Sequence, residues 1–163
     1  MAAILDARQL LVGAEATADR VIEAATTAGI IHLACHGRFS RESPVTSGLK
    51  LADRWLTVRE IFGMRLRADL VTLSGCDTGR TVIGRGDELV GLLRGFLAAG
   101  AVALVVSLWT VNDESAAELI VRFYDARRTG RTWSAALHLA QRDLLVERPH
   151  PAFWAPFMIG DRP

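Results

Sequence analysis

Three largely hydrophobic runs stand out along the chain, and each has the length of a β-strand. They cover residues 30–34 (IIHLA), 69–74 (DLVTLS) and 101–109 (AVALVVSLW). A strand that lacks alternation of polar and apolar residues is typical of a parallel sheet covered on both faces. The pattern therefore predicts three buried parallel strands.

Between these runs, hydrophobic residues recur at the spacing of amphipathic helices. The pattern predicts helices over residues 17–28, 87–99, 113–126 and 132–146. Gly29 and Gly100 follow two of them, as expected where a helix ends. A further short helix is predicted in TVREIFG, where Thr57 and Glu60 have the spacing of a capping box.

Shorter patterns complete the prediction. We expect a short strand over residues 8–12, a hairpin in GLKLADRWLT and a last strand in AFWAPFMIG. Strands that alternate with amphipathic helices predict an α/β fold, in which helices cover both faces of a mostly parallel sheet. The 163 residues contain no repeat or linker, so we expect a single domain over residues 1–163.

Composition narrows the functional classes. A formal net charge of +1 without a basic stripe gives no reason to expect nucleic-acid binding. The longest apolar stretch, FLAAGAVALVVSLW, is too short to span a bilayer, and we expect no membrane partner. Two cysteines and an N-terminus unlike a signal peptide predict a cytoplasmic protein.

Two predicted strands end beside residues that could form one catalytic site. His36 follows the first strand and Cys76 follows the second. If the two strands are neighbours, both side chains open into one crevice beyond the carboxyl ends of the sheet. Side chains alternate along a strand, so His32 and His36 share one face and Cys35 points to the other. Spacing alone leaves a second interpretation equally open, in which Cys76 is a small buried thiol.

The chemistry of such a pair would be nucleophilic catalysis by cysteine. A free thiol is only slightly ionised at neutral pH and requires a nearby base. His36 could accept the thiol proton and later deliver it to the leaving amine. The backbone N–H groups of Gly37 and Cys76 are candidate oxyanion-hole donors. Gly75 would leave room for a peptide beside Cys76.

Four stretches, in one order along the chain, carry a family resemblance. HLACHGRF, LVTLSGCDTG, GDELVGLLRGFLAAGAVALVVSLWTVNDESA and HPAFWAPFMIGD resemble the CHAT domain, a caspase- and separase-like protease domain of prokaryotes often found beside tetratricopeptide repeats. The resemblance runs from about residue 8 to residue 161. It implies a caspase-like sandwich fold and a Cys–His dyad without an obligatory third member or a cofactor. His36 falls on the catalytic histidine of the family and Cys76 on its nucleophile.

The resemblance also implies a biological role. CHAT domains usually have a further helix and strand region upstream and regulatory repeats before it, so we expect this chain to be a trimmed or C-terminal piece of a larger protein. The implied activity is that of a cysteine endopeptidase that cleaves a protein partner, or itself, in bacterial defence or programmed cell death. A companion effector such as a bacterial gasdermin is one such substrate. Two alternatives stay open: a catalytically latent interaction module, and acyl transfer to a small molecule.

Other residues are candidates for supporting roles. Ser74 replaces the acidic residue that metacaspases carry two positions before the cysteine. Asp113 resembles the S1 position of separase-like enzymes and would favour Arg or Lys at P1. The same residue could instead serve the N-terminus of the following helix. Asp77 and the pair Asp87 and Glu88 are lesser candidates. His32 is expected to be a satisfied histidine of the core, or one that supports the residues of the site, rather than a zinc ligand, and no metal site is predicted.

Overall fold

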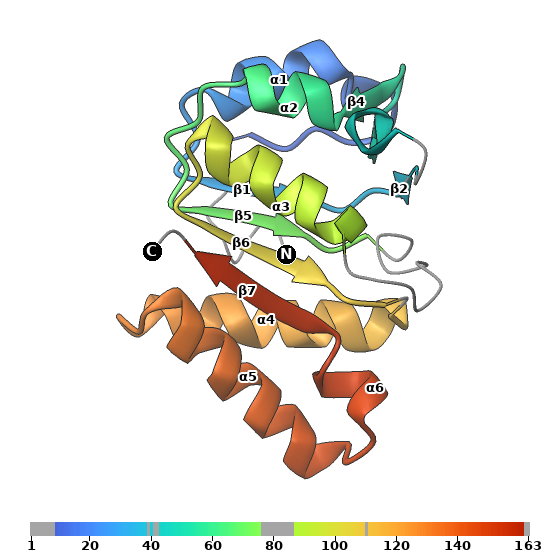
Figure 1. Ribbon diagram of the computed structural model, residues 1–163. Helices are drawn as coiled ribbons and strands as arrows, with labels where there is room; N and C mark the ends of the chain where they lie inside the picture. The colour runs from blue at the N-terminus through green and yellow to red at the C-terminus, as the bar shows by residue number, and fades with distance from the viewer. Residues whose placement is uncertain (1–8, 39, 41–42, 76–86, 110, 162–163) are drawn as a thin grey trace.

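A four-stranded sheet forms the centre of the fold in this computed structural model, with strand order β1-β5-β6-β7 (Figure 1). The structure describes residues 9–38, 40, 43–75, 87–109 and 111–161, with the backbone alone at 87–90. The strands of this sheet are β1 (Ile30–Leu33), β5 (Leu70–Leu73), β6 (Ala103–Ser107) and β7 (Phe157–Asp161). Strands β1, β5 and β6 are parallel and β7 is antiparallel to β6, which confirms the predicted mostly parallel sheet.

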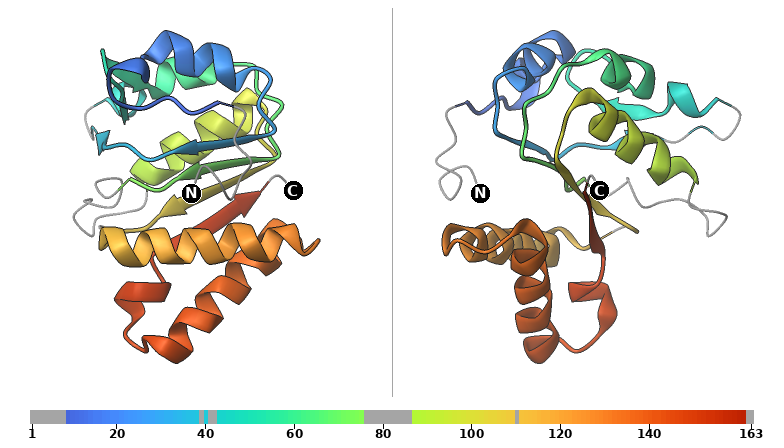
Figure 2. Two further views of the ribbon diagram at one scale, coloured as in Figure 1. Left: turned by 180° about the vertical axis from the view of Figure 1, so that it is seen from behind. Right: turned by 60° about the vertical axis from the view of Figure 1, so that its left-hand side comes forward.

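Helices lie on both sides of this sheet, as predicted (Figures 1 and 2). One side carries α1 (Ala18–Ala25), α2 (Val58–Gly63) and α3 (Asp87–Ala99). The other side carries α4 (Asp113–Arg128) and α5 (Trp133–Glu147). The chain is thus an α/β sandwich with a mostly parallel sheet, which is consistent with the fold that the resemblance implies.

The alternation of side chains along the central strands builds two separate cores. In β5, Val71 and Leu73 pack with α1, α2 and α3, whereas Leu70 packs with α4 and α5. In β6, Val106 belongs to the first core and Val105 to the second. All of these side chains are essentially inaccessible to solvent. Strands buried on both faces explain the continuous hydrophobic runs in the sequence.

A second, three-stranded sheet confirms the predicted hairpin. It consists of β2 (Gly37–Arg38), β3 (Gly48–Lys50) and β4 (Trp55–Thr57), which pair antiparallel in this order. Helix α2 follows directly, and its predicted capping box is present. The Glu60 N–H donates to Thr57 Oγ1 at 3.3 Å, and the Thr57 N–H donates to Glu60 Oε2 at 2.9 Å. Caps of this kind stabilise a helix by about 1 kcal/mol.

Two predictions about the first part of the chain were wrong. The described residues of the expected strand 8–12 form no strand, and Leu10 and Val12 are 63% and 64% exposed. Strand β1 is not buried on both faces. Among the described strands it lies at the edge of the sheet and pairs with β5 alone, and Ile30 is 39% exposed.

The prediction of one continuous last strand was also wrong. Pro151–Trp154 form the short helix α6, and β7 begins only at Phe157. Proline at the first helical position is already fixed near a helical φ, and its missing N–H costs no hydrogen bond there. His150 caps this turn, because its Nδ1 accepts the Ala152 N–H at 3.2 Å.

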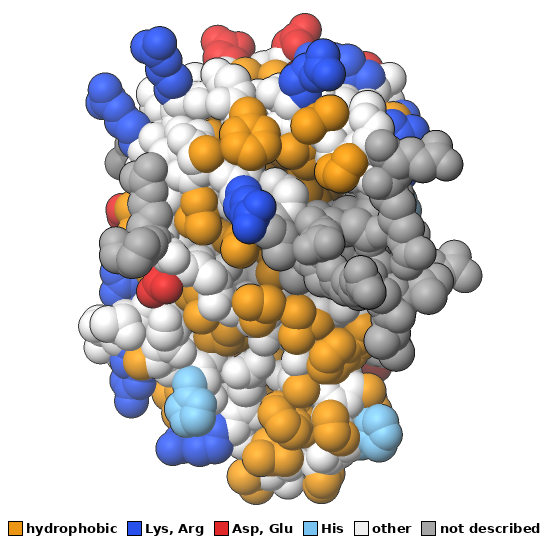
Figure 3. Space-filling view, in the orientation of Figure 1, with side chains coloured by type: hydrophobic (Ala, Val, Ile, Leu, Met, Phe, Trp, Pro, Cys, Tyr) orange, Lys and Arg blue, Asp and Glu red, His pale blue; other side chains and the backbone are white. Residues whose placement is uncertain are grey.

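The outer surface has one feature of note. In the view of Figure 3, hydrophobic side chains gather over β7 and α6. Met158 of β7, for example, is 36% exposed. No helix within the described parts of the chain is both long and apolar enough to cross a membrane.

Candidate functional site

The strands that precede His36 and Cys76 are direct neighbours, as the sequence analysis required. Strand β1 pairs in parallel with β5, with Leu33 opposite Leu73. The ladder continues one step further, because the Ser74 N–H donates to the Leu33 carbonyl at 3.1 Å. Carboxyl ends of parallel strands lie at the same end of a sheet, which is where open α/β sheets bind ligands.

Beyond these strands the two backbones touch. A Cβ atom placed on Gly75 would lie 1.7 Å from the Cys35 carbonyl oxygen, so only glycine fits there. This corrects the expected role of Gly75, because the space beside its Cα is occupied by the chain itself and not by a substrate peptide. Cys35 and Gly75 are the residues immediately before His36 and Cys76 in the sequence.

His36 is an exposed residue between β1 and β2. Its carbonyl accepts the Lys50 N–H at 2.7 Å, which makes His36 and Lys50 a hydrogen-bonded pair of the small sheet. In an antiparallel ladder, hydrogen-bonded and non-hydrogen-bonded pairs alternate. Gly37 and Leu49 form the next pair, so the Gly37 N–H is directed away from β3. This orientation is consistent with an oxyanion-hole donor.

Two of the predicted residues, Cys76 and Asp77, lie outside the part of the chain that the structure describes. Helix α3 begins at Asp87, but the side chains of Asp87 and Glu88 are likewise not described. The distance between Cys76 Sγ and the His36 ring therefore stays a prediction.

A hollow with a volume of about 160 Å³ lies next to these strand ends. Two of its residues, Ala34 and Ser74, each precede a predicted dyad residue by two positions. Asp113 contributes from the first position of α4, where its side chain is exposed. The described residues that line it are Ala34, Ser74, Asp113, Ala116, Ala117 and Ile120.

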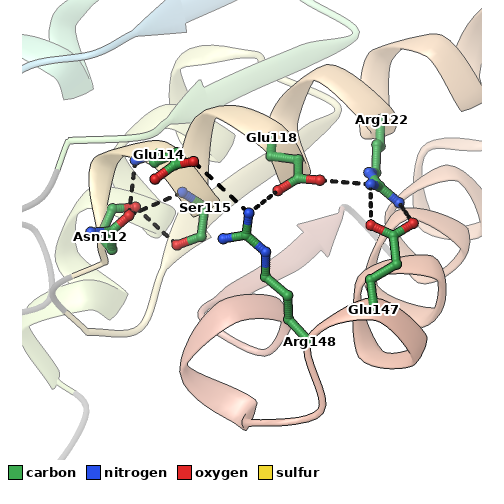
Figure 4. Close-up of polar contacts among 7 residues, drawn as sticks. All are labelled: Asn112, Glu114, Ser115, Glu118, Arg122, Glu147 and Arg148. Carbon is green, nitrogen blue, oxygen red and sulfur yellow. Dashed lines mark hydrogen bonds and ion pairs between the residues drawn. The ribbon is translucent and has the colours of Figure 1, made fainter.

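The cap of α4 is a residue other than Asp113. Asn112 Oδ1 accepts the N–H groups of Glu114 and Ser115 at 3.0 Å and 3.2 Å (Figure 4). The capping role that the sequence left open for Asp113 therefore belongs to Asn112. Asp113 contributes a negative charge to the first turn, which is favourable at the positive end of the helix dipole.

A network of ion pairs connects α4 with α5 and with the segment after α5 (Figure 4). Arg122 contacts Glu118 on its own helix and Glu147 at the end of α5, each at 2.6 Å. Arg148 contacts Glu118 at 3.2 Å and Glu114 at 3.9 Å. This network thus connects α4, the helix that contributes Asp113 to the hollow, with the C-terminal part of the described chain.

His32 is a satisfied core histidine, as predicted. Its Nε2 lies 2.7 Å from Ser74 Oγ, and its Nδ1 lies 3.0 Å from the Tyr124 hydroxyl. Burial lowers the pKa of His32 to about 4. Cys35 is an odd number of positions after His32, so its side chain points to the opposite face and packs with the core on the α1, α2 and α3 side. Burial raises the pKa of its thiol to about 11. The predicted alternation of faces is thus confirmed for His32 and Cys35.

Sequence reasoning missed the polar role of Tyr124. The Tyr124 hydroxyl also contacts Thr72 Oγ1 at 2.8 Å, and it joins β1, β5 and α4 through hydrogen bonds. Burial raises its pKa to about 12. The sequence carried a signal only for the strand side of this network, because His32, Thr72 and Ser74 are polar residues on one face of otherwise hydrophobic strands. Within the described residues, no three His, Cys, Asp or Glu side chains are grouped as a metal site would require.

Comparison with known proteins adds independent information. The sequence model of the CHAT domain matches residues 1–161. Tetratricopeptide repeat protein 28 of Homo sapiens is 27% identical to this chain, and the match covers 93% of this chain. The protein of the same name from Mus musculus is 28% identical, and its match also covers 93% of this chain. The chain spans only 8% of the length of each relative. Because the family match covers almost all of the chain and agrees with its α/β sandwich, the chain belongs to the CHAT domain family.

Proposed function

We propose that this CHAT domain is a cysteine endopeptidase in which Cys76 is the nucleophile and His36 is the general base. The observation that carries the proposal is the contact between the backbones of Cys35 and Gly75. It brings together the two positions from which the chain continues into His36 and Cys76. Adjacent parallel strands and the neighbouring hollow support the same assignment.

The proposed reaction follows the usual course of cysteine catalysis. Cys76 transfers its thiol proton to the His36 imidazole, and the thiolate attacks the carbonyl carbon of the scissile peptide bond. The oxyanion that forms accepts hydrogen bonds from the N–H groups of Gly37 and Cys76. His36 then protonates the leaving amine as the C–N bond breaks. A water molecule, deprotonated by His36, hydrolyses the thioester and restores the thiol.

The hollow is the proposed S1 pocket. Asp113 places a carboxylate at its wall, and apolar residues such as Ala116 and Ile120 complete it. An aliphatic stem that ends in N–H donors matches this combination, so Asp113 favours Arg or Lys at P1. The substrate that we propose is a companion protein encoded beside this chain, such as a bacterial gasdermin, with a role in defence or programmed death.

The first test is cleavage of such companion proteins and of a peptide library that varies P1. We expect Cys76→Ala to abolish cleavage, with a loss of about 10⁴-fold or more in kcat/KM, because no other group can form the thioester. Cys35→Ala is the matched control, since the buried Cys35 thiol has no part in the reaction and its removal should leave kcat unchanged. Equal turnover by Cys76→Ala and the wild type would refute the assigned nucleophile.

A second candidate function has one observation in its favour. The matched relatives are named for tetratricopeptide repeats, so a CHAT domain can occur in repeat proteins. In that case the domain would be a latent interaction module that a partner activates or simply binds. Cleavage that appears only after a repeat-containing partner is added would favour this candidate over a constitutive peptidase.

A further inference from the structure

A chain of four polar side chains runs through the second core and ends at the hollow. Thr72 Oγ1 contacts the Tyr124 hydroxyl at 2.8 Å, and this hydroxyl contacts His32 Nδ1 at 3.0 Å. His32 Nε2 then contacts Ser74 Oγ at 2.7 Å. Thr72, at the inner end, is completely buried, whereas Ser74, at the outer end, is half-buried and lines the hollow.

The number of protons determines which way these hydrogen bonds point. Each of the four groups carries one proton when His32 is neutral, and burial keeps it neutral at pH 7. Three hydrogen bonds use three of these protons. One proton is therefore left over. Because neutral His32 donates through one nitrogen and accepts through the other, this proton belongs to Thr72, Tyr124 or Ser74.

Burial decides among these groups. If Ser74 donated inward, the unused proton would be on Thr72 or on Tyr124, and both hydroxyls are buried and have no further hydrogen-bond partner among the described residues. A buried donor without a partner costs about 1–3 kcal/mol. If all three hydrogen bonds point outward from Thr72, every buried proton is used, and the unused proton is on Ser74 beside the hollow. The favoured order of donation is thus from Thr72 to Tyr124, then to His32 and finally to Ser74.

We propose that Ser74 is a hydrogen-bond donor in the wall of the hollow and that the hollow accepts a side-chain carboxamide, from glutamine or asparagine, in addition to the basic side chains that Asp113 favours. The carboxamide oxygen accepts from the Ser74 hydroxyl, and its NH₂ group donates to the Asp113 carboxylate. His32, Tyr124 and Thr72 are positioning residues that set the direction of the Ser74 hydroxyl. The assignment of this carboxamide to P1 rests on the proposed peptidase function.

This inference distinguishes two kinds of occupant. Arginine and lysine carry donors only, so they gain from Asp113 but have no acceptor for Ser74. Ser74 Oγ can accept an N–H from such a side chain through its second lone pair, but the unused Ser74 proton then finds no acceptor on that side chain. A carboxamide presents an acceptor for this proton and a donor for Asp113. The Ser74 proton therefore contributes to the recognition of glutamine and not to that of lysine.

The direction of donation can be measured without any activity. A long-range ¹H–¹⁵N correlation spectrum identifies which ring nitrogen of His32 carries the proton, with His32→Gln to assign the signal. We expect the proton on Nε2 in the wild type. Thr72→Val should keep it there, because Tyr124 still has a buried proton to donate to His32. Tyr124→Phe should give a mixture, because neither tautomer is then favoured by a partner. A proton on Nδ1 in the wild type would overturn the proposed direction.

The choice of occupant is tested with matched peptides that differ only in glutamine or lysine at P1. Ser74→Ala should lower the ratio of kcat/KM for glutamine over lysine by about 5- to 10-fold, the effect of one lost hydrogen bond. Ser74→Thr keeps the hydroxyl and should restore the ratio. Tyr124→Phe should lower it by about twofold, because about half of the molecules then present the wrong direction.

The two proposals fail in different ways. If the wild type cleaves lysine peptides but not glutamine peptides, or if Ser74→Ala leaves the ratio unchanged, carboxamide recognition is wrong and the peptidase stands. If the wild type cleaves no peptide at all, the peptidase proposal fails. The tautomer of His32 still decides the direction of the hydrogen-bond chain in that case.

Discussion

Asp113 combines two properties that a residue in a binding pocket needs. It lines the hollow, and the structural task of capping α4 is carried out by Asn112. The cap of α4 therefore does not depend on the Asp113 carboxylate. Its neighbour Glu114, one position further along the same turn, pairs with Arg148 and does not line the hollow.

This contrast gives a residue-scale prediction. Asp113→Asn should lower kcat/KM for peptides with Arg or Lys at P1 by about 10- to 100-fold, the range of one hydrogen bond between charged groups. Glu114→Gln removes the same charge from the same helical turn and should leave these values unchanged. Initial rates on a P1 peptide series measure both variants. Equal losses in the two variants would indicate a general charge effect and remove Asp113 from the pocket.

At this scale the sequence identified some side chains and not others. His36, Gly37 and Asp113 could be selected because each stands just after a hydrophobic strand. Tyr124 could not, because a tyrosine in a hydrophobic helical stripe is typical of a core residue. Its hydroxyl meets His32, which is 92 positions away in the chain. Only the packing of α4 against the sheet brings these two groups together.

At the scale of elements, the close approach between the ends of β5 and β1 is possible because Gly75 has no side chain. Any side chain at Gly75 would collide with the Cys35 carbonyl, which follows the end of β1. The separation of these two strand ends thus depends on a single glycine. Gly91 of α3 provides a contrast, because a Cβ placed there would meet nothing within 4 Å.

We predict opposite effects for alanine at these two glycines. Gly75→Ala should separate the ends of β1 and β5 and lower the melting temperature. It should also reduce the peptidase activity of the protein that remains folded. Gly91→Ala should stabilise the protein by up to about 1 kcal/mol, because alanine favours a helix more than glycine does. Thermal unfolding and peptide cleavage measure both variants. Retention of full activity in Gly75→Ala would contradict the role of this contact.

Local elements were more predictable than their arrangement. The capping box of Thr57 and Glu60 lies within four residues, so the start of α2 could be located from the sequence. The position of β1 at the edge of the sheet depends on which strands pair, and this is decided by contacts between distant segments. For the same reason, AFWAPFMIG suggested one strand, although Pro151 and the His150 cap start a helical turn there.

At the scale of the whole molecule, the burial of His32 affects stability. The pKa of His32 is about 4 in the folded protein, against 6.5 for an unperturbed histidine. Below pH 6.5 the unfolded chain takes up a proton that the folded protein does not accept until about pH 4. The free energy of unfolding must therefore fall as the pH decreases between these two values.

The expected loss is up to about 3 kcal/mol between pH 7 and pH 4, with no further loss from this group below pH 4. Urea unfolding at a series of pH values measures it. His32→Gln lacks the titrating group and should show a smaller pH dependence over this range, while His36, His138 and His150 are present in both proteins. An NMR titration of the wild type should give a pKa near 4 for His32. Equal pH profiles of the two proteins would contradict the prediction.

The antiparallel direction of β7 has a practical consequence. Asp161, the last residue of this strand, lies opposite Ala103 at the amino end of β6, whereas the candidate site lies beyond the carboxyl ends of β1 and β5. Anything joined after Asp161 therefore starts at the far end of the sheet (Figure 1). A fluorescent reporter or an immobilisation tag attached there would leave the hollow open, which makes this terminus the suitable handle for capturing substrates on a surface.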